Sequence, residues 1–156
     1  MKTILLLEDN CTVMCVLRLA LRDYNLVEAT SAEQALREFL RYERDIDLLI
    51  ADVSLPVSSG IHVALLLRDH RYDLAIVLTS GYPAHMWSDQ DAADLRRLGS
   101  LNIALLQKPF LPAELLKIAN GLLDPPSCAD STSLRSVSMS GPIEPAYRTP
   151  YGQRRS

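Results

Sequence analysis

The chain has 156 residues, of which 48% are hydrophobic and 22% are charged, and its formal net charge is −3. This length fits one domain of ordinary size, and the apolar share excludes a wholly disordered or fibrous chain. The slightly acidic balance argues against a protein that binds nucleic acid mainly through charge. Three cysteines do not make a disulfide framework. The first apolar run, residues 4–7, is too short for a signal peptide or a membrane span, so we expect a cytoplasmic protein without membrane attachment.

Five short apolar runs alternate with amphipathic stretches along most of the chain. These runs, each of strand length, are 4–7, 26–29, 48–51, 75–79 and 102–106. The first, third and fourth runs are apolar throughout, as expected for central strands covered on both faces. Glu28 interrupts the second run, which suits a strand at the edge of a sheet.

Helical periodicity fills the intervals between these runs. The predicted helices lie within 11–21, 32–40, 60–70, 84–98 and 115–122. Asn10 and Ser31 are suitable N-caps, and Ser31 forms a capping box with Gln34. Strands that alternate with helices predict an α/β domain with a five-stranded, parallel, doubly wound sheet and five helices.

The composition changes near Leu123. Residues 124–156 are rich in Pro, Ser, Gly and Thr and have no apolar periodicity. Such a segment cannot bury enough apolar surface to offset the entropy lost on ordering. The sequence therefore predicts a folded domain over 1–123 and a disordered tail over 124–156, with a modified docking segment as the alternative for the tail.

Five polar residues stand directly at the carboxyl ends of predicted strands. They are Glu8, Asp9, Asp52, Thr79 and Lys108. Parallel strands bring their carboxyl ends to one edge of the sheet, and open α/β sheets bind ligands at that edge. The topology therefore predicts that residues spread over a hundred positions form one site.

Three carboxylates held close together require a cation, because like charges otherwise raise one another's pKa. A hard divalent ion such as Mg²⁺ takes carboxylate oxygens, keeps water ligands and shares phosphate oxygens. Lys108 adds a positive charge and Thr79 adds a hydroxyl donor. This set predicts a magnesium-dependent pocket for a phosphoryl group, with Asp52 as the nucleophile.

Four stretches carry these residues: LLLEDN, DLLIADVSLPVSSG, IVLTSGYP and LLQKPF. In this order they resemble the signature stretches of the response-regulator receiver domain of two-component signalling, and the resemblance covers residues 3 to about 123. It implies a flavodoxin-like sheet with strand order 2-1-3-4-5. It also implies a phosphorylatable switch that catalyses only its own phosphotransfer and self-dephosphorylation, rather than a metabolic enzyme.

The resemblance implies a role for each residue at the predicted acceptor site. Asp52 matches the phosphoacceptor, and Glu8 and Asp9 match the acidic pair that holds Mg²⁺. The backbone carbonyl of Ser54 matches the remaining protein ligand of the metal. Ser54 and Gly81 match the two positions that modulate hydrolysis of the phosphoryl group.

The resemblance also implies how a phosphoryl group is sensed, and here the chain departs from the usual pattern. Thr79 matches the switching hydroxyl and Lys108 the lysine that contacts a phosphoryl oxygen, followed by a cis bond to Pro109. Leu105 stands where many receivers carry a Tyr or Phe that reorients. The chain also looks longer than compact receivers around residues 85–95. We therefore expect the acceptor chemistry to be intact and the readout to differ.

Some distinctive residues have a structural alternative. Cys11 and Cys15, one helical turn apart, are expected to be small hydrophobic residues packed against the sheet rather than a redox pair. Tyr82 and Trp87 are candidates for a partner-binding face, but packing of the region around the fourth helix explains them equally well.

The function expected from the sequence is that of a single-domain response regulator. Its partners would be a sensor histidine kinase or phosphotransfer protein and an unidentified downstream protein, with no nucleic acid. Two alternatives remain open. One is a phosphohydrolase with an aspartate nucleophile, although haloacid-dehalogenase-like enzymes carry a DxD pair after the first strand where this chain reads EDN. The other is a receiver module that belongs to a longer hybrid histidine kinase.

Overall fold

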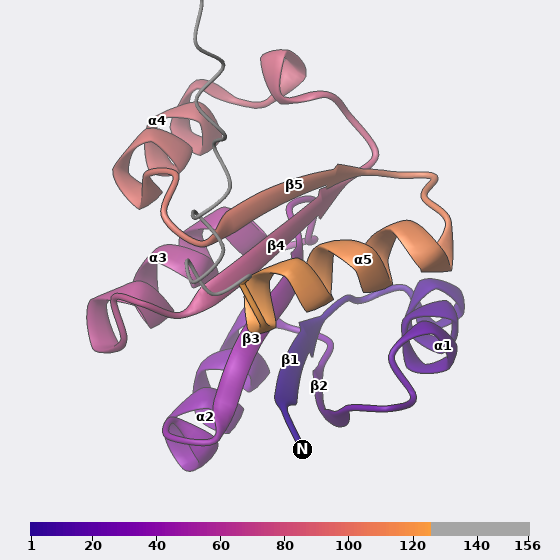
Figure 1. Ribbon diagram of the computed structural model, residues 1–156. Helices are drawn as coiled ribbons and strands as arrows, with labels where there is room; N and C mark the ends of the chain where they lie inside the picture. The colour runs from indigo at the N-terminus through magenta and orange to yellow at the C-terminus, as the bar shows by residue number, and fades with distance from the viewer. Residues whose placement is uncertain (126–156) are drawn as a thin grey trace, which may run out of the picture. The chain divides into compact units, whose positions relative to one another are not determined.

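A parallel five-stranded sheet lies at the centre of the computed structural model (Figure 1), which describes residues 1–125. Its strands are β1 (Thr3–Leu7), β2 (Asn25–Ala29), β3 (Ile46–Asp52), β4 (Ala75–Ser80) and β5 (Ile103–Gln107). They lie in the order β2-β1-β3-β4-β5 with parallel register throughout. The expected flavodoxin-like order is confirmed. The tail predicted over 124–156 lies, apart from its first two residues, outside the described part of the chain.

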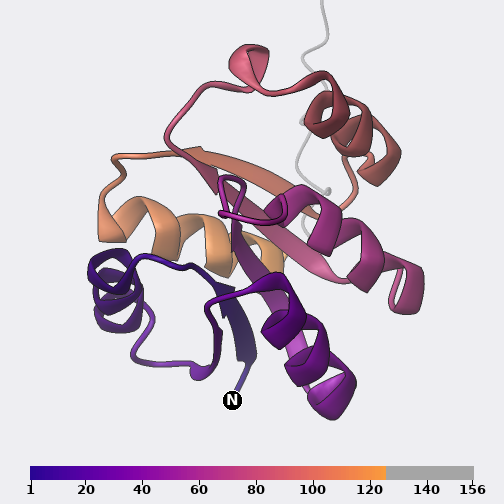
Figure 2. The same ribbon diagram turned by 180° about the vertical axis from the view of Figure 1, so that it is seen from behind.

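Five α-helices cover the two faces of this sheet. They are α1 (Cys11–Ala20), α2 (Ala32–Tyr42), α3 (Gly60–His70), α4 (Asp89–Leu98) and α5 (Pro112–Leu123). Helices α1 and α5 pack on one face (Figure 1), and α2, α3 and α4 pack on the other, which Figure 2 shows from behind. None of the helices within residues 1–125 has the length and apolar character needed to cross a membrane.

Burial of the strands follows their place in the sheet. Every residue of β4 is buried, as are residues 4–7 of β1 and all but Asp47 of β3. Strands covered on both faces need apolar side chains at successive positions, which accounts for their unbroken apolar runs. The edge strands β2 and β5 are only partly buried. In β2, Glu28 forms an ion pair with Arg18 of α1, with 2.5 Å between Oε2 and Nη2.

The helices begin at the residues expected from capping chemistry. Asn10 accepts hydrogen bonds from the backbone N–H groups of Thr12 and Val13, and Ser31 accepts one from Gln34. These bonds satisfy backbone donors that have no partner inside the helix. Both predicted N-caps are confirmed, and the first fixes the chain direction immediately after Asp9. The predicted capping box is not formed, because the side chain of Gln34 accepts the backbone N–H of Thr30 rather than that of Ser31.

The region predicted to hold the fourth helix contains two elements. A short 3₁₀ helix, η1 (Ala84–Met86), precedes α4, which begins at Asp89 with Ser88 as its N-cap. The side chain of Trp87 lies between them and donates from Nε1 to the backbone carbonyl of Tyr82 at 3.0 Å. The segment that joins β4 to α4 therefore contains a short helix of its own, and α4 begins later than the start of the predicted range.

The prediction that Cys11 and Cys15 pack against the sheet is wrong. Both thiols are exposed, whereas Met14 and Leu17 form the buried stripe of α1. Residues three apart share a helix face, and the two cysteines lie outside the stripe that these buried residues define. The buried face of α1 is narrower than the sequence pattern predicts.

Gly60, the first residue of α3, lies against the backbone of β3. A Cβ atom at this position would lie 2.1 Å from the carbonyl oxygen of Asp52. The Gly60 N–H also donates to the carbonyl of Val53 at 3.3 Å. The loop from Asp52 to α3 can therefore close this tightly only with glycine at position 60.

We predict that Gly60→Ala lowers the free energy of unfolding by about 2–3 kcal/mol, because the added methyl group has no space beside the β3 backbone. Urea denaturation measures this loss. Gly121→Ala in α5 is the matched control, since a Cβ there meets nothing within 4 Å. That change should stabilise the protein by about 0.5–1 kcal/mol through helix propensity. Equal effects of the two substitutions would contradict the close approach at Gly60.

Candidate phosphoacceptor site

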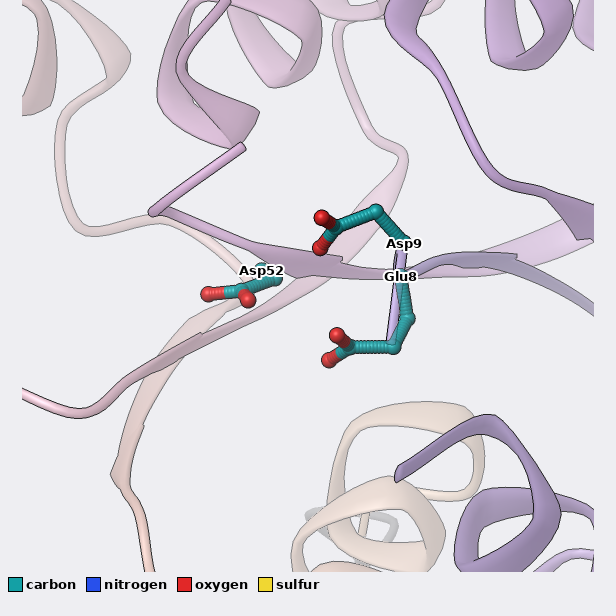
Figure 3. A group of neighbouring side chains, drawn as sticks. All are labelled: Glu8, Asp9 and Asp52. Atoms are coloured by element: carbon teal, nitrogen blue, oxygen red, sulfur yellow. The ribbon is translucent and has the colours of Figure 1, made fainter. Parts of the chain in front are cut away.

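The five predicted polar residues converge at one edge of the sheet. Glu8 and Asp9 follow β1, Asp52 ends β3, Thr79 lies near the end of β4, and Lys108 follows β5. Figure 3 shows the carboxylates of Glu8, Asp9 and Asp52 gathered at this edge. One oxygen from each lies within 4.8 Å of the others. The predicted convergence is therefore found in the structure.

Lys108 joins the ends of three strands. Its Nζ lies 2.7 Å from Oε2 of Glu8 and 2.9 Å from Oδ2 of Asp52. Its backbone N–H donates to the carbonyl of Ser80 at 2.7 Å, and its bond to Pro109 is cis, as the resemblance implied. The lysine thus bridges the two carboxylates that lie deepest in the site.

The carboxylates differ in their surroundings. Glu8 and Asp52 are buried, with 2% and 6% of their surface exposed, whereas Asp9 is exposed. The second oxygen of Glu8 accepts the backbone N–H of Asn10 at 3.1 Å, and Oδ1 of Asp52 accepts that of Ser54 at 3.0 Å. Asp52 is therefore held from one side by Lys108 and from the other by its own loop.

The ammonium group of Lys108 experiences two opposing effects. Burial lowers its pKa, but hydrogen bonds and charge interactions with Glu8 and Asp52 raise it, and the net shift is upward. The stabilisation that accompanies this upward shift is therefore present at neutral pH and is lost as the pH rises through the raised pKa of the lysine. Lys108 remains charged under all conditions in which the site would work.

The charges at the site suit a divalent cation. Three carboxylates and one ammonium leave two negative charges at this edge when all are ionised. The partly exposed position of Asp9 leaves a hard cation room to keep water ligands, which Mg²⁺ prefers. The donor set is therefore chemically suited to Mg²⁺.

Thr79 of β4 lies beside Asp52 of β3 in the sheet and forms hydrogen bonds with β3 and with the residue that follows it. It is paired with Asp52 in the parallel register of β3 and β4, and its hydroxyl lies 3.5 Å from the carbonyl of Ala51. Its own carbonyl accepts the backbone N–H of Val53 at 2.9 Å. A hydroxyl held this loosely is available to donate to a group attached to Asp52.

The sequence predicted Gly60 only as the first residue of a helix, and the close approach of Gly60 to the backbone of Asp52 was not predicted. The glycine itself was the available signal, because a residue without a Cβ permits a close approach between two backbones. Ser54 lies where predicted, in the loop after Asp52, and forms an isolated bridge with Ser59. Gly81 lies in the loop after β4 and is exposed.

We predict that Lys108→Met lowers the free energy of unfolding at pH 7 by about 3 kcal/mol, because it leaves Glu8 and Asp52 buried without a counter-charge. Urea unfolding at pH 7 tests this. The exposed Lys117 of α5 supplies the control Lys117→Met, which should be nearly neutral. A Lys108 variant as stable as this control would contradict the bridging role.

The segment that contains this site matches a known protein family. The family model of the response regulator receiver domain matches residues 4–120. Among curated proteins, the chain is 27% identical over 124 residues to the sensor kinase CckA of Brucella abortus. That match covers 78% of this chain but only 12% of the length of the kinase.

Solved structures of similar fold also include receiver domains. A response regulator receiver protein from Sinorhizobium medicae is 27% identical, with a TM-score of 0.66 over 80% of this chain and 95% of that one. The receiver domain of an HD-domain-containing protein from Pseudomonas fluorescens is 26% identical, with a TM-score of 0.66 over 78% and 94%. Chemotaxis protein CheY4 from Vibrio cholerae shares the fold at 23% identity, with a TM-score of 0.67 over 79% and 99%. With its family match, strand order and acidic edge in agreement, the chain belongs to the response regulator receiver family of two-component signalling.

Proposed function

We propose that Asp52 accepts a phosphoryl group from a phosphohistidine on a sensor histidine kinase or a phosphotransfer protein. The observation that supports this most strongly is the bridge from Lys108 to Asp52 inside a cluster of three carboxylates. Receiver domains generally act as switches rather than as metabolic enzymes, and the match to the receiver family supports the same role for this chain. The reaction would then be the chain's own phosphotransfer, followed by self-dephosphorylation.

The residues at the site have distinct parts in this proposal. A carboxylate oxygen of Asp52 attacks phosphorus as the bond to the histidine nitrogen breaks. Lys108, already within hydrogen-bond distance of Asp52, can move its interaction to a phosphoryl oxygen. The hydroxyl of Thr79 can turn from the carbonyl of Ala51 to donate to the same group. Both changes replace existing contacts with contacts to the added charge.

The metal would be held by the acidic cluster. Glu8, Asp9 and Asp52 would supply carboxylate oxygens and Ser54 its backbone carbonyl, as the resemblance implied. When bound, Mg²⁺ supplies positive charge that offsets the charge developing on the transferring phosphoryl group. Asp9 is the most accessible of the three carboxylates.

The downstream role that we propose is that of a single-domain regulator in the cytoplasm, which acts through a protein partner or passes its phosphoryl group onward. A second candidate is a receiver module of a longer hybrid kinase, because the curated relative is a sensor kinase of which this chain spans 12%. The phosphohydrolase alternative gains no support, since the candidate nucleophile follows β3 rather than β1. If the protein purified from its own cells carries a kinase region on the same chain, the hybrid-kinase module is favoured over the single-domain regulator.

We predict that the protein incubated with acetyl phosphate and Mg²⁺ gains the mass of one phosphoryl group. Asp52→Asn should abolish this gain, because an amide cannot act as the nucleophile, and a chelator should abolish it in wild type. Intact-mass spectrometry measures both effects. The exposed Asp23, in the turn after α1, provides the control Asp23→Asn, which should be labelled like wild type. Equal labelling of the Asp52 variant would overturn the assignment.

A further inference from the structure

A cavity of about 350 Å³ lies beside the acceptor site, between the loop that follows β3 and the segment that joins β4 to α4. Side chains from both segments line it. They include Ser54, Val57, Tyr82, Met86, Trp87 and Asp91. Its volume is at the lower end of the range for small-ligand pockets and is enough for one long side chain with its neighbours.

Large apolar side chains around this cavity are exposed. The exposed fractions are 98% for Val57, 61% for Met86 and 59% for Tyr82. Single exposed apolar residues are normal, but several around one cavity mark a surface that gains stability when it is covered. A partner segment that contributes apolar contacts would fit this rim.

The cavity also carries one carboxylate that has no lysine or arginine partner among the described residues. Asp91 is the one carboxylate among the lining residues that the structure describes, and no lysine or arginine lines the cavity with it. Its Oδ2 accepts the hydroxyl of Ser88 at 2.8 Å, which satisfies a hydrogen bond but not the charge. The indole of Trp87 and the side chain of Met86 complete the wall. A carboxylate beside an aromatic ring suits a cation that has an apolar stem.

We propose that this cavity binds an arginine side chain, flanked by apolar residues, from a protein partner. The guanidinium group would pair with Asp91 and stack on Trp87, and the flanking residues would cover Val57, Tyr82 and Met86. Arginine is preferred over lysine because its planar group can pair with a carboxylate and lie on a ring at the same time.

One wall of the cavity is hydrogen-bonded to Asp52, and the other is hydrogen-bonded to Ser80, the residue after Thr79. Ser54, in one wall, donates its backbone N–H to Asp52. On the other wall, the hydroxyl of Ser80, next to Thr79, accepts the backbone N–H of Tyr82 at 3.1 Å, and Tyr82 in turn accepts from Trp87. A phosphoryl group at Asp52 would add negative charge near the cavity and displace Thr79. Phosphorylation should therefore strengthen the binding of the arginine, a step that rests on the proposed function.

This route also accounts for the leucine at position 105. Leu105 is 46% exposed and has no ring that could move between an inner and an outer site. The loop after β4 lies next to it, and one smaller cavity of about 220 Å³ is lined by Leu105, Tyr82 and Trp87 together. The rings that respond to phosphorylation would be those of the loop, without an aromatic residue in β5.

The test uses the full chain and the peptide acetyl-Leu-Arg-Leu-amide, with acetyl-Leu-Gln-Leu-amide as the uncharged control. Trp87 is the one tryptophan of the chain, so its emission reports binding, and amide shifts locate it. The arginine peptide should bind with shifts at 53–59 and 82–91, and Asp91→Asn should weaken it about fivefold, the effect of one partly exposed ion pair. Asp89→Asn, in the same first turn of α4 but outside the cavity, is the matched control and should bind as wild type does.

The beryllofluoride complex, which imitates the phosphoryl group, should bind the peptide about fivefold more tightly than the free protein. Absence of binding, equal binding of the glutamine peptide, or equal weakening by Asp89→Asn and Asp91→Asn would overturn the arginine site. Phosphate uptake by the Asp91 variant, measured by intact mass, should equal that of wild type. If Asp52 takes up no phosphate while the Asp91-dependent binding persists, the proposed function fails and the arginine site stands. If the peptide does not bind while Asp52 takes up phosphate normally, the arginine site fails and the proposed function stands.

Discussion

The ammonium group of Lys108 is the contact on which the site depends. Two carboxylates, Glu8 and Asp52, are buried at neighbouring strand ends, and a buried charge without a partner is costly in free energy. Lys108 supplies a positive partner at 2.7 and 2.9 Å, from a position one hundred residues after Glu8. The parallel sheet makes this possible, because it brings the ends of β1, β3 and β5 to the same edge. Two negative charges remain in excess, and they make the edge suitable for a divalent cation.

Backbone contacts and hydrogen bonds restrict the conformation of the loops that follow β3 and β4. The close approach of Gly60 to the backbone of Asp52 fixes the path from β3 to α3. Ser54 donates its backbone N–H to Asp52, and Tyr82 donates its backbone N–H to the hydroxyl of Ser80, the residue after Thr79. Under the proposal, a change at the acceptor would be transmitted through these contacts to a surface with exposed apolar residues and an unpaired carboxylate. Apolar burial supports the sheet, while polar contacts hold the site and its surroundings.

Much of this could be predicted from the sequence because the strands are buried on both faces, which makes the apolar runs of β1, β3 and β4 unmistakable. The polar residues at the ends of β1, β3 and β5 then identified Glu8, Asp52 and Lys108 as neighbours. Contacts across the fold were harder to predict. Asp94 of α4 has the sequence context of a surface residue on a polar helix, but it is buried. Its Oδ1 accepts a hydrogen bond from Gln90, and its Oδ2 lies 3.8 Å from Nδ1 of His62. Cys11 and Cys15 are exposed because the buried stripe of α1 runs through Met14 and Leu17, on another side of the helix, and the apolar pattern of so short a helix did not separate the two sides.

Calorimetric titration with Mg²⁺ tests the central claim most directly, because it asks whether the excess negative charge at the sheet edge binds a divalent ion. The account predicts one site in wild type and at least about tenfold weaker binding in Asp9→Asn, which removes the most accessible carboxylate. Asp45→Asn, an equal change of charge in the turn before β3, should leave the affinity unchanged. Absence of Mg²⁺ binding, or equal weakening by the two substitutions, would contradict the account.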